Sequence, residues 1–180
     1  VNGMSYTIFG GDILKIEVNY FKGNGNVITT GQLGDVFIES AKIALSYIKS
    51  NYKYFGIDYD ILEQNDIHIH VPEGAIRKDG PSAGVTLTTA IISAVTKRKI
   101  ASNISMTGEI TLRGEILSIG GLKEKIIGAK RAGVTKIYLP SQNEKDLEEI
   151  EDYIKEGIRF IFVSNYKELY KDLISTKKEY

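Results

Sequence analysis

Several features that define common protein classes are missing from this 180-residue sequence. It contains no cysteine, which excludes disulfides, thiolate metal ligands and a cysteine nucleophile. It has no run of ~18 apolar residues, the length that a membrane-spanning helix needs. Its 23 basic and 23 acidic residues balance, so no excess charge favours nucleic acid or an acidic membrane surface. These absences predict a protein of a reducing, soluble compartment.

The composition supports a packed core. Hydrophobic residues make up 42% of the chain, and a chain of this length buries roughly 70% of the surface that its unfolded form exposes. We expect one domain over residues 1–180, frayed at residues 1–9 and 175–180. The first residue is Val1 rather than methionine, which indicates a piece excised from a longer protein.

Two predicted hairpins lie in the first two thirds of the chain. In residues 14–18, apolar side chains alternate with charged ones, which predicts a half-buried strand. This strand ends at the turn Gly23-Asn24-Gly25, so we expect it to pair with residues 26–30. A second hairpin is expected over residues 104–117, turning at Arg113-Gly114.

Helical patterns separate and follow these strands. Residues 35–50 have the spacing of an amphipathic helix, and residues 85–95 are apolar or small nearly all round, as in a helix buried in the core. Strands are expected at 66–71, 136–139 and 158–163, and further helices at 120–132, 146–155 and 166–174. The pattern predicts an α+β, or mixed α/β, domain with antiparallel hairpins near the N-terminus and a βα-alternating C-terminal half.

The stretch KDGPSAG, residues 78–84, places a serine between a predicted strand and the buried helix. Pro81 pre-sets φ for a first helical turn, with Asp79 or Gly80 near the N-cap, so Ser82 is expected within that turn. Unpaired backbone N–H groups and the helix dipole favour negative charge there. Three interpretations follow, in which the serine belongs to a helix cap, to a phosphate cradle or to a nucleophilic site.

A serine nucleophile needs a general base, and histidine is the usual one. The sequence has two histidines, His68 and His70, which share one face of a predicted strand. They are candidates for the base of Ser82 or for a metal-binding pair. No pattern of a third metal ligand accompanies them.

Lysine is the better candidate for the base. In GGLKEKIIGAK, Lys125 lies on the same helical face as Leu122, Ile126 and Ala129, which must turn toward the core. Burial on that face disfavours the ammonium form and lowers the pKa, so the free amine becomes a competent base near neutral pH. In the alternative interpretation, Lys125 extends its amine to water from the edge of this face.

Three motifs stand at residues 79–84 (DGPSAG), 107–117 (TGEITLRGEIL) and 120–125 (GGLKEK). In order and spacing they closely resemble the proteolytic domain of the ATP-dependent Lon proteases of the A type, and weaker similarity extends from about Gly10 to Ile150. The resemblance implies the Lon protease domain fold, with Ser82 as nucleophile and Lys125 as its base.

The same resemblance assigns supporting roles to neighbouring residues. It implies that Thr107 forms a hydrogen bond with the lysine and that backbone N–H groups around Gly80 and Ser82 hold the oxyanion. Asp79 corresponds to the acid that contacts the lysine and distorts the site in inactive family members. No metal or other cofactor is implied for this domain.

The resemblance also implies a function and partners. Family members are serine endopeptidases that degrade unfolded, misfolded and regulatory proteins, and they couple proteolysis to an AAA+ ATPase that uses ATP and Mg²⁺ in a ring of six subunits. Because this chain has no G-x-x-x-x-G-K-[ST] phosphate loop, we expect the ATPase and a substrate-binding region to lie outside it. We therefore expect the domain alone to cleave unfolded peptides slowly or not at all. The expected compartment is the cytoplasm or, alternatively, a mitochondrial or other organelle matrix.

Two other classes stay open. One is a catalytically silent Lon-like domain that serves assembly or accessory binding in another ATPase. Such domains lack the serine and lysine pair, whereas both residues are present here. The other is a phosphate-binding enzyme in which residues 80–84 cradle a nucleotide, although its catalytic carboxylate and nucleobase loop are not identifiable.

Overall fold

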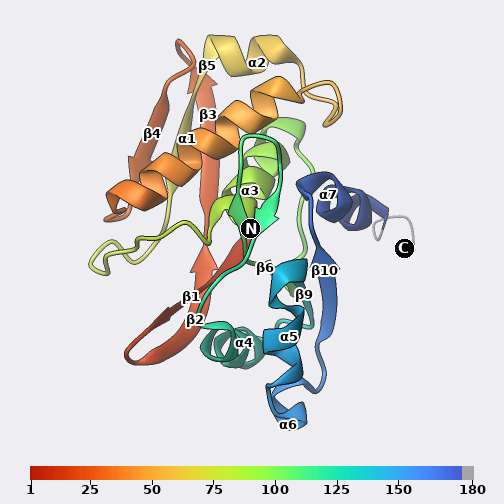
Figure 1. Ribbon diagram of the computed structural model, residues 1–180. Coiled ribbons are helices and arrows are strands. Elements are labelled where there is room, and N and C mark those ends of the chain that lie inside the picture. The colour runs from red at the N-terminus through yellow and green to blue at the C-terminus, as the bar shows by residue number, and fades with distance from the viewer. Residues whose placement is uncertain (176–180) are drawn as a thin grey trace.

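The computed structural model describes residues 1–175 (Figure 1). Strands and helices alternate along the chain and form an α+β domain, as the sequence pattern predicts. The strands form a five-stranded sheet, a three-stranded sheet and a short two-stranded ribbon. The expected fraying at the C-terminus falls on residues 176–180, which lie outside the described part, and on Ser175, which is the last residue of a helix.

The five-stranded sheet has the order β10-β9-β6-β1-β2. Its strands are β1 (Asn2–Thr7), β2 (Gly10–Lys15), β6 (Ile104–Met106), β9 (Lys136–Pro140) and β10 (Arg159–Val163). β1 and β2 form an antiparallel hairpin, and β1, β6, β9 and β10 pair in parallel. The parallel pairing of the C-terminal half is therefore confirmed.

Residues 1–9, which are expected to fray, include the strand β1 (Asn2–Thr7). β1 lies inside the sheet, between β6 and β2. Met4 anchors it, because its side chain is 2% exposed and belongs to a hydrophobic cluster with Leu122 and Ile126. Residues 2–7 are thus held in the sheet, whereas Ile8 and Phe9, in the turn after β1, are 95% and 92% exposed.

The three-stranded sheet has the order β3-β5-β4 and consists of β3 (Glu17–Lys22), β4 (Val27–Thr30) and β5 (Asn65–His70). The predicted hairpin of residues 14–18 with 26–30 is wrong, because β5 lies between the two segments. β5 pairs antiparallel with β3 and parallel with β4. The turn after β3 is bound to β5, since Asp66 Oδ1 accepts hydrogen bonds from the backbone of Asn24 and Asn26 at 3.0 and 2.9 Å.

Two long helices, α1 (Asp35–Ser50) and α3 (Gly84–Thr96), pack against each other. Figure 1 shows α1 lying across the three-stranded sheet. α2 (Tyr59–Gln64) leads into β5, and α7 (Tyr166–Ser175) closes the described chain. The core between these elements holds an aromatic group in which Tyr47, Phe55 and Tyr166 make edge-to-face contacts with ring centroids 5.8 to 5.9 Å apart. α3 packs against this core, which holds the helix in place.

α4 (Leu122–Arg131) packs on the β1–β2 hairpin, and a second hydrophobic cluster joins it to the five-stranded sheet. The predicted turn at Arg113-Gly114 is confirmed by the short ribbon of β7 (Glu109–Ile110) and β8 (Ile116–Leu117). The strand β6 before them belongs to the large sheet instead. None of the helices within residues 1–175 is long and apolar enough to cross a bilayer.

The single helix expected at 146–155 consists of two short helices, α5 (Glu144–Glu148) and α6 (Asp152–Lys155), and a 3-10 turn, η1 (Ser141–Asn143), precedes them. The break allows Ile150 and Ile154, which are 7% and 5% exposed, to enter the second cluster together. Lys155 Nζ donates to the carbonyl of Leu147 at 3.2 Å, and the same carbonyl accepts from the backbone N–H of Ile150 at 3.1 Å, so the break is bridged by two hydrogen bonds.

Gly11 and Gly128 allow β2 and α4 to approach closely. A Cβ added at Gly11 would lie 1.7 Å from the carbonyl oxygen of Glu124, and one at Gly128 would lie 2.3 Å from the carbonyl carbon of Gly11. Both obstacles are backbone atoms, so α4 would have to move away from the sheet. The close contact thus sets the depth at which α4 and its lysine lie.

Gly11→Ala is expected to destabilise the chain by about 2 kcal/mol or more, because overpacking forces backbone shifts. The measurement is urea unfolding followed by circular dichroism. Gly74→Ala is the matched control, since a Cβ there meets nothing within 4 Å, and its midpoint should stay close to that of the unchanged chain. Equal midpoints for both variants would contradict the close-packing argument.

Candidate active site

Ser82 lies in a turn just before α3, not in its first helical turn as the sequence predicts. Ala83 is the N-cap and the helix begins at Gly84. The carbonyl of Ser82 accepts a hydrogen bond from the backbone N–H of Gly108 at 2.9 Å. Its partner thus lies in the segment after β6 and not in the helix. Ser82 is partly exposed. Gly80, two residues earlier, has φ of 107°, a left-handed conformation that glycine adopts without strain.

Asp79 faces the N-terminus of α1. Its Oδ1 accepts hydrogen bonds from the backbone N–H of Gly80 at 2.9 Å and of Phe37 at 3.1 Å. The hydrogen bond from Gly80 lowers the pKa of the Asp79 carboxyl most, and the one from Phe37 lowers it further. The carboxylate is thus held at the first turn of α1. Its hydrogen bonds go to Gly80 and Phe37 and not to Lys125.

The two backbone N–H groups expected to hold an oxyanion, those of Gly80 and Ser82, differ in their hydrogen bonds. The Gly80 N–H donates to Asp79, so it is not available in this conformation, in contrast to the expectation. The Ser82 N–H has no hydrogen-bond acceptor within residues 1–175. The difference arises because the carboxylate of Asp79 reaches the amide that follows it directly in the chain.

Lys125 is buried within α4, with 2% of its surface exposed. Its Nζ donates to Thr107 Oγ1 at 3.3 Å and lies 5.8 Å from the centroid of the Tyr6 ring. Burial lowers the pKa of Lys125 from 10.5 to about 8. The interpretation in which this side chain reaches out to water is therefore wrong.

Thr107 links Lys125 to Ser82. Its hydroxyl accepts from Lys125 Nζ at 3.3 Å and donates to the Ser82 carbonyl oxygen at 3.5 Å. Thr107 is 1% exposed and directly follows β6. The structure therefore brings Ser82, Thr107 and Lys125 together from three separate segments of the chain.

His68 and His70 lie elsewhere. Their ring nitrogens, Nε2 of His68 and Nδ1 of His70, are both within hydrogen-bond distance of Thr30 Oγ1, at 2.9 and 2.7 Å. Both rings thus interact with the neighbouring strand β4. Within the described residues, no three His, Cys, Asp or Glu side chains gather as a metal-binding group.

Sequence analysis missed Tyr6 because it treated residues 1–9 as frayed. The Tyr6 ring lies over Lys125, and a Cβ at Gly121, whose φ is 66°, would fall 2.3 Å from a ring carbon. Gly121 is the N-cap of α4. The second glycine of the third motif, Gly121, therefore makes room for the Tyr6 ring over the lysine.

A buried lysine with a lowered pKa, positioned by a hydroxyl group beside a partly exposed serine, is chemistry used by serine hydrolases that replace histidine with lysine. Residues 1–176 match the family described as Lon protease (S16) C-terminal proteolytic domain. The chain is 52% identical over 179 residues to "Lon protease 1" of Bacillus subtilis (strain 168), covering 99% of this chain and 23% of that protein.

Similar relatives occur in other bacteria. The chain is 53% identical over 169 residues to "Lon protease" of Clostridioides difficile (strain 630), and 51% identical over 179 residues to "Lon protease" of Mycoplasma mycoides subsp. mycoides SC. These matches cover 94% and 99% of this chain, and 22% of each relative. The chain belongs to the Lon protease family, as its C-terminal proteolytic domain.

The burial of Lys125 predicts a dependence of stability on pH. Below pH 8 the folded chain holds a desolvated ammonium, which costs free energy, and this cost disappears as the pH rises from about 8 to 10.5. We therefore expect Lys125→Met to be more stable than the unchanged chain by about 2 kcal/mol at pH 7, with the difference closing across that interval.

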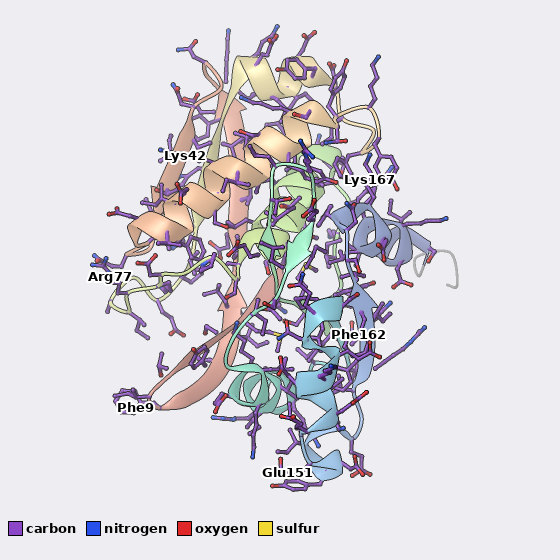
Figure 2. The ribbon with its side chains drawn as sticks, viewed as in Figure 1. Phe9, Lys42, Arg77, Glu151, Phe162 and Lys167 are labelled. Atoms are coloured by element: carbon purple, nitrogen blue, oxygen red, sulfur yellow. The ribbon has the colours of Figure 1, made fainter. Side chains whose placement is uncertain are left out.

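Urea unfolding at a series of pH values from 7 to 11 measures this difference. The matched control is Lys42→Met on the exposed face of α1 (Figure 2), where no buried charge is removed. A difference between Lys125→Met and the unchanged chain that stays constant from pH 7 to 11 would show that the Lys125 ammonium is not desolvated.

Proposed function

We propose that this chain is the proteolytic part of an ATP-dependent Lon protease and that Ser82 and Lys125 form its catalytic dyad. The observation that carries the assignment is the buried Lys125 amine, bound to the hydroxyl of Thr107. That hydroxyl is in turn 3.5 Å from the Ser82 carbonyl. No histidine shares this arrangement, because both interact with Thr30.

In the proposed reaction, neutral Lys125 takes the hydroxyl proton of Ser82 as Oγ attacks the peptide carbonyl carbon. The negative charge on the carbonyl oxygen is stabilised by backbone N–H groups at the turn, with that of Ser82 in position to donate. Lys125 then returns the proton to the leaving amine, and an ester on Ser82 remains. Water, deprotonated by the same lysine, releases the acid product and restores the serine.

The domain needs no cofactor of its own for this chemistry. We propose that it works within a longer chain whose AAA+ ATPase uses ATP and Mg²⁺ to unfold polypeptides, since the chain spans less than a quarter of the length of the relatives it matches. The substrates are then unfolded, misfolded and regulatory proteins, the assembly is a ring of six subunits, and the compartment is the cytoplasm.

A catalytically silent assembly domain is the less favoured alternative. It would have no use for a desolvated lysine, whose burial costs stability at neutral pH. Lys136 offers a comparison, because it is also buried, at 8% exposure, but has a carboxylate partner in Asp172 at 2.9 Å. A purely structural lysine is expected to be compensated in that way.

Hydrolysis of a fluorogenic unfolded peptide from pH 6 to 10 tests the dyad. Lys125→Ala and Ser82→Ala are each expected to reduce kcat by at least about 10³-fold, as loss of a member of a catalytic pair does. The rate of the unchanged chain should rise with pH through a single ionisation near 8, because only the neutral amine accepts the proton.

Lys123→Ala is the matched control on the same helix. Lys123 is nearly half exposed and forms an ion pair with Glu151 at 3.0 Å, at the outer end of the molecule (Figure 2). Its removal should leave kcat nearly unchanged. Activity in Lys125→Ala equal to that of the unchanged chain would overturn the assignment of the base.

Thr107 is expected to orient the amine of Lys125. Thr107→Val removes the hydroxyl and keeps the shape, so kcat should fall about 10- to 100-fold, the typical range for a misdirected catalytic group. Thr107→Ser retains the hydroxyl and should recover most of the rate. If valine and serine gave the same kcat, the hydroxyl would have no part in orienting Lys125.

A further inference from the structure

Lys78, the first residue of KDGPSAG, makes an unusual set of contacts. Its Nζ donates to three backbone carbonyl oxygens, those of Gly31 at 3.0 Å, Val71 at 3.3 Å and Glu73 at 2.6 Å. An ammonium group has three N–H donors, so the three bonds use its full capacity. We call this arrangement the carbonyl clasp of Lys78.

The carbonyl clasp joins Lys78 to two segments that are distant in sequence, one after β4 and one after β5, which end side by side because these strands pair in parallel. Gly31 directly follows β4, Val71 directly follows β5, and Glu73 begins the exposed loop that returns to Lys78. Figure 2 shows Arg77, the last residue of that loop, projecting from the side of the molecule. The ammonium therefore closes the base of this loop and ties it to the ends of two strands.

The backbone around the clasp is strained. Gln32 and Glu73 have φ of 60° and 67°, and they are two of the three non-glycine residues with positive φ in the described chain. Gly31 has φ of 113°, and a Cβ there would lie 2.2 Å from the Val71 carbonyl oxygen. Strained positions persist only where the surroundings hold them, and they gather at functional sites. Charge-assisted hydrogen bonds from Lys78 supply that restraint.

Backbone hydrogen bonds of Lys78 also fix the segment that leads to Ser82. Its N–H donates to the carbonyl of Gln32 at 3.0 Å and its carbonyl accepts from Gly34 at 2.7 Å. The next residue, Asp79, is bound to the N-terminus of α1. Ser82 follows three residues later, and its carbonyl is held from the other side by Gly108. The turn that carries Ser82 is thus fixed at both ends.

We propose that Lys78 is a positioning residue, whose carbonyl clasp fixes the entry of the Asp79–Ser82 turn and thereby the direction in which Ser82 faces Lys125. The inference rests on the proposed function of these two residues and adds a third that does not touch the substrate or the reacting atoms. It acts through the backbone, by holding the ends of β4 and β5 against the segment that leads to the nucleophile.

The carbonyl clasp requires a compact cation. The three oxygens converge on one nitrogen, which suits an ammonium group with three donors around a single atom. The planar guanidinium of arginine spreads its donors over a fork and can reach only some of these oxygens. Methionine keeps an unbranched side chain as far as Cε but lacks the terminal ammonium group and provides no donor.

The test compares kcat and KM for a fluorogenic peptide in the unchanged chain, Lys78→Met and Lys78→Arg. Lys78→Met is expected to lower kcat about 10- to 100-fold while KM changes little, because a small misplacement of a reacting group has an effect of this order. The midpoint of the pH profile should stay where it is, since Lys125 is untouched. Lys78→Arg should recover part of the rate, and Lys42→Met on α1 serves as a control with the same chemical change.

Amide hydrogen exchange gives a second readout that does not depend on activity. In Lys78→Met, exchange should accelerate in residues 79–84, while α4 and its Lys125 keep their protection. If kcat and the exchange of residues 79–84 both equal those of the unchanged chain, the inference is overturned. Parallel loss of protection in α4 would also overturn it, because Lys78 would then act on global stability.

The two proposals fail in distinguishable ways. If Lys125→Ala cleaves the peptide as fast as the unchanged chain, the proposed dyad fails, while hydrogen exchange still decides whether Lys78 fixes the turn. If the unchanged chain is active and depends on Lys125, but Lys78→Met matches it in kcat, the dyad stands and the role of Lys78 is refuted.

Discussion

The burial of one uncompensated amine, that of Lys125, is the constraint on which the site depends. Within the described residues it forms no ion pair with a carboxylate, and its hydrogen bond goes to the neutral hydroxyl of Thr107. Desolvation therefore acts unopposed and lowers the pKa to about 8. A neighbouring acid would have kept the amine charged and unable to accept a proton. By contrast, the buried Lys136 of β9 forms an ion pair with Asp172 of α7 at 2.9 Å.

The rest of the fold places and protects this amine. Gly11 and Gly128 let α4 pack closely on the β1–β2 hairpin, and this close packing removes Lys125 from water. The Tyr6 ring of the same hairpin lies over the Lys125 amine. Thr107 comes from the end of β6, in the middle of the same sheet. Half of the site therefore belongs to the five-stranded sheet and its own hydrophobic cluster.

The serine comes from the other half of the molecule. Its turn follows the three-stranded sheet and is tied to α1 through Asp79 and to the strand ends through Lys78. The hydrogen bond from the Gly108 backbone to the Ser82 carbonyl connects the two halves. This bond also explains why Ser82 stands outside α3, since a carbonyl engaged with Gly108 is withdrawn from the helical ladder. The relative position of nucleophile and base is thus a property of how the halves pack.

The sequence by itself determined the helices 35–50 and 85–95 to within a few residues and the inward face of Lys125, because a period of 3.6 residues reports which side of a helix is apolar. It could not determine that β5 would separate β3 from β4, that β1 would be an inner strand, or that Ser82 would precede its helix. Nor could it show that the Asp79 carboxylate accepts a hydrogen bond from the Gly80 N–H, or that Lys78 forms its carbonyl clasp. Those features were decided by tertiary structure, because hydrogen bonds between distant segments choose partners that a local pattern of apolar and polar residues does not encode.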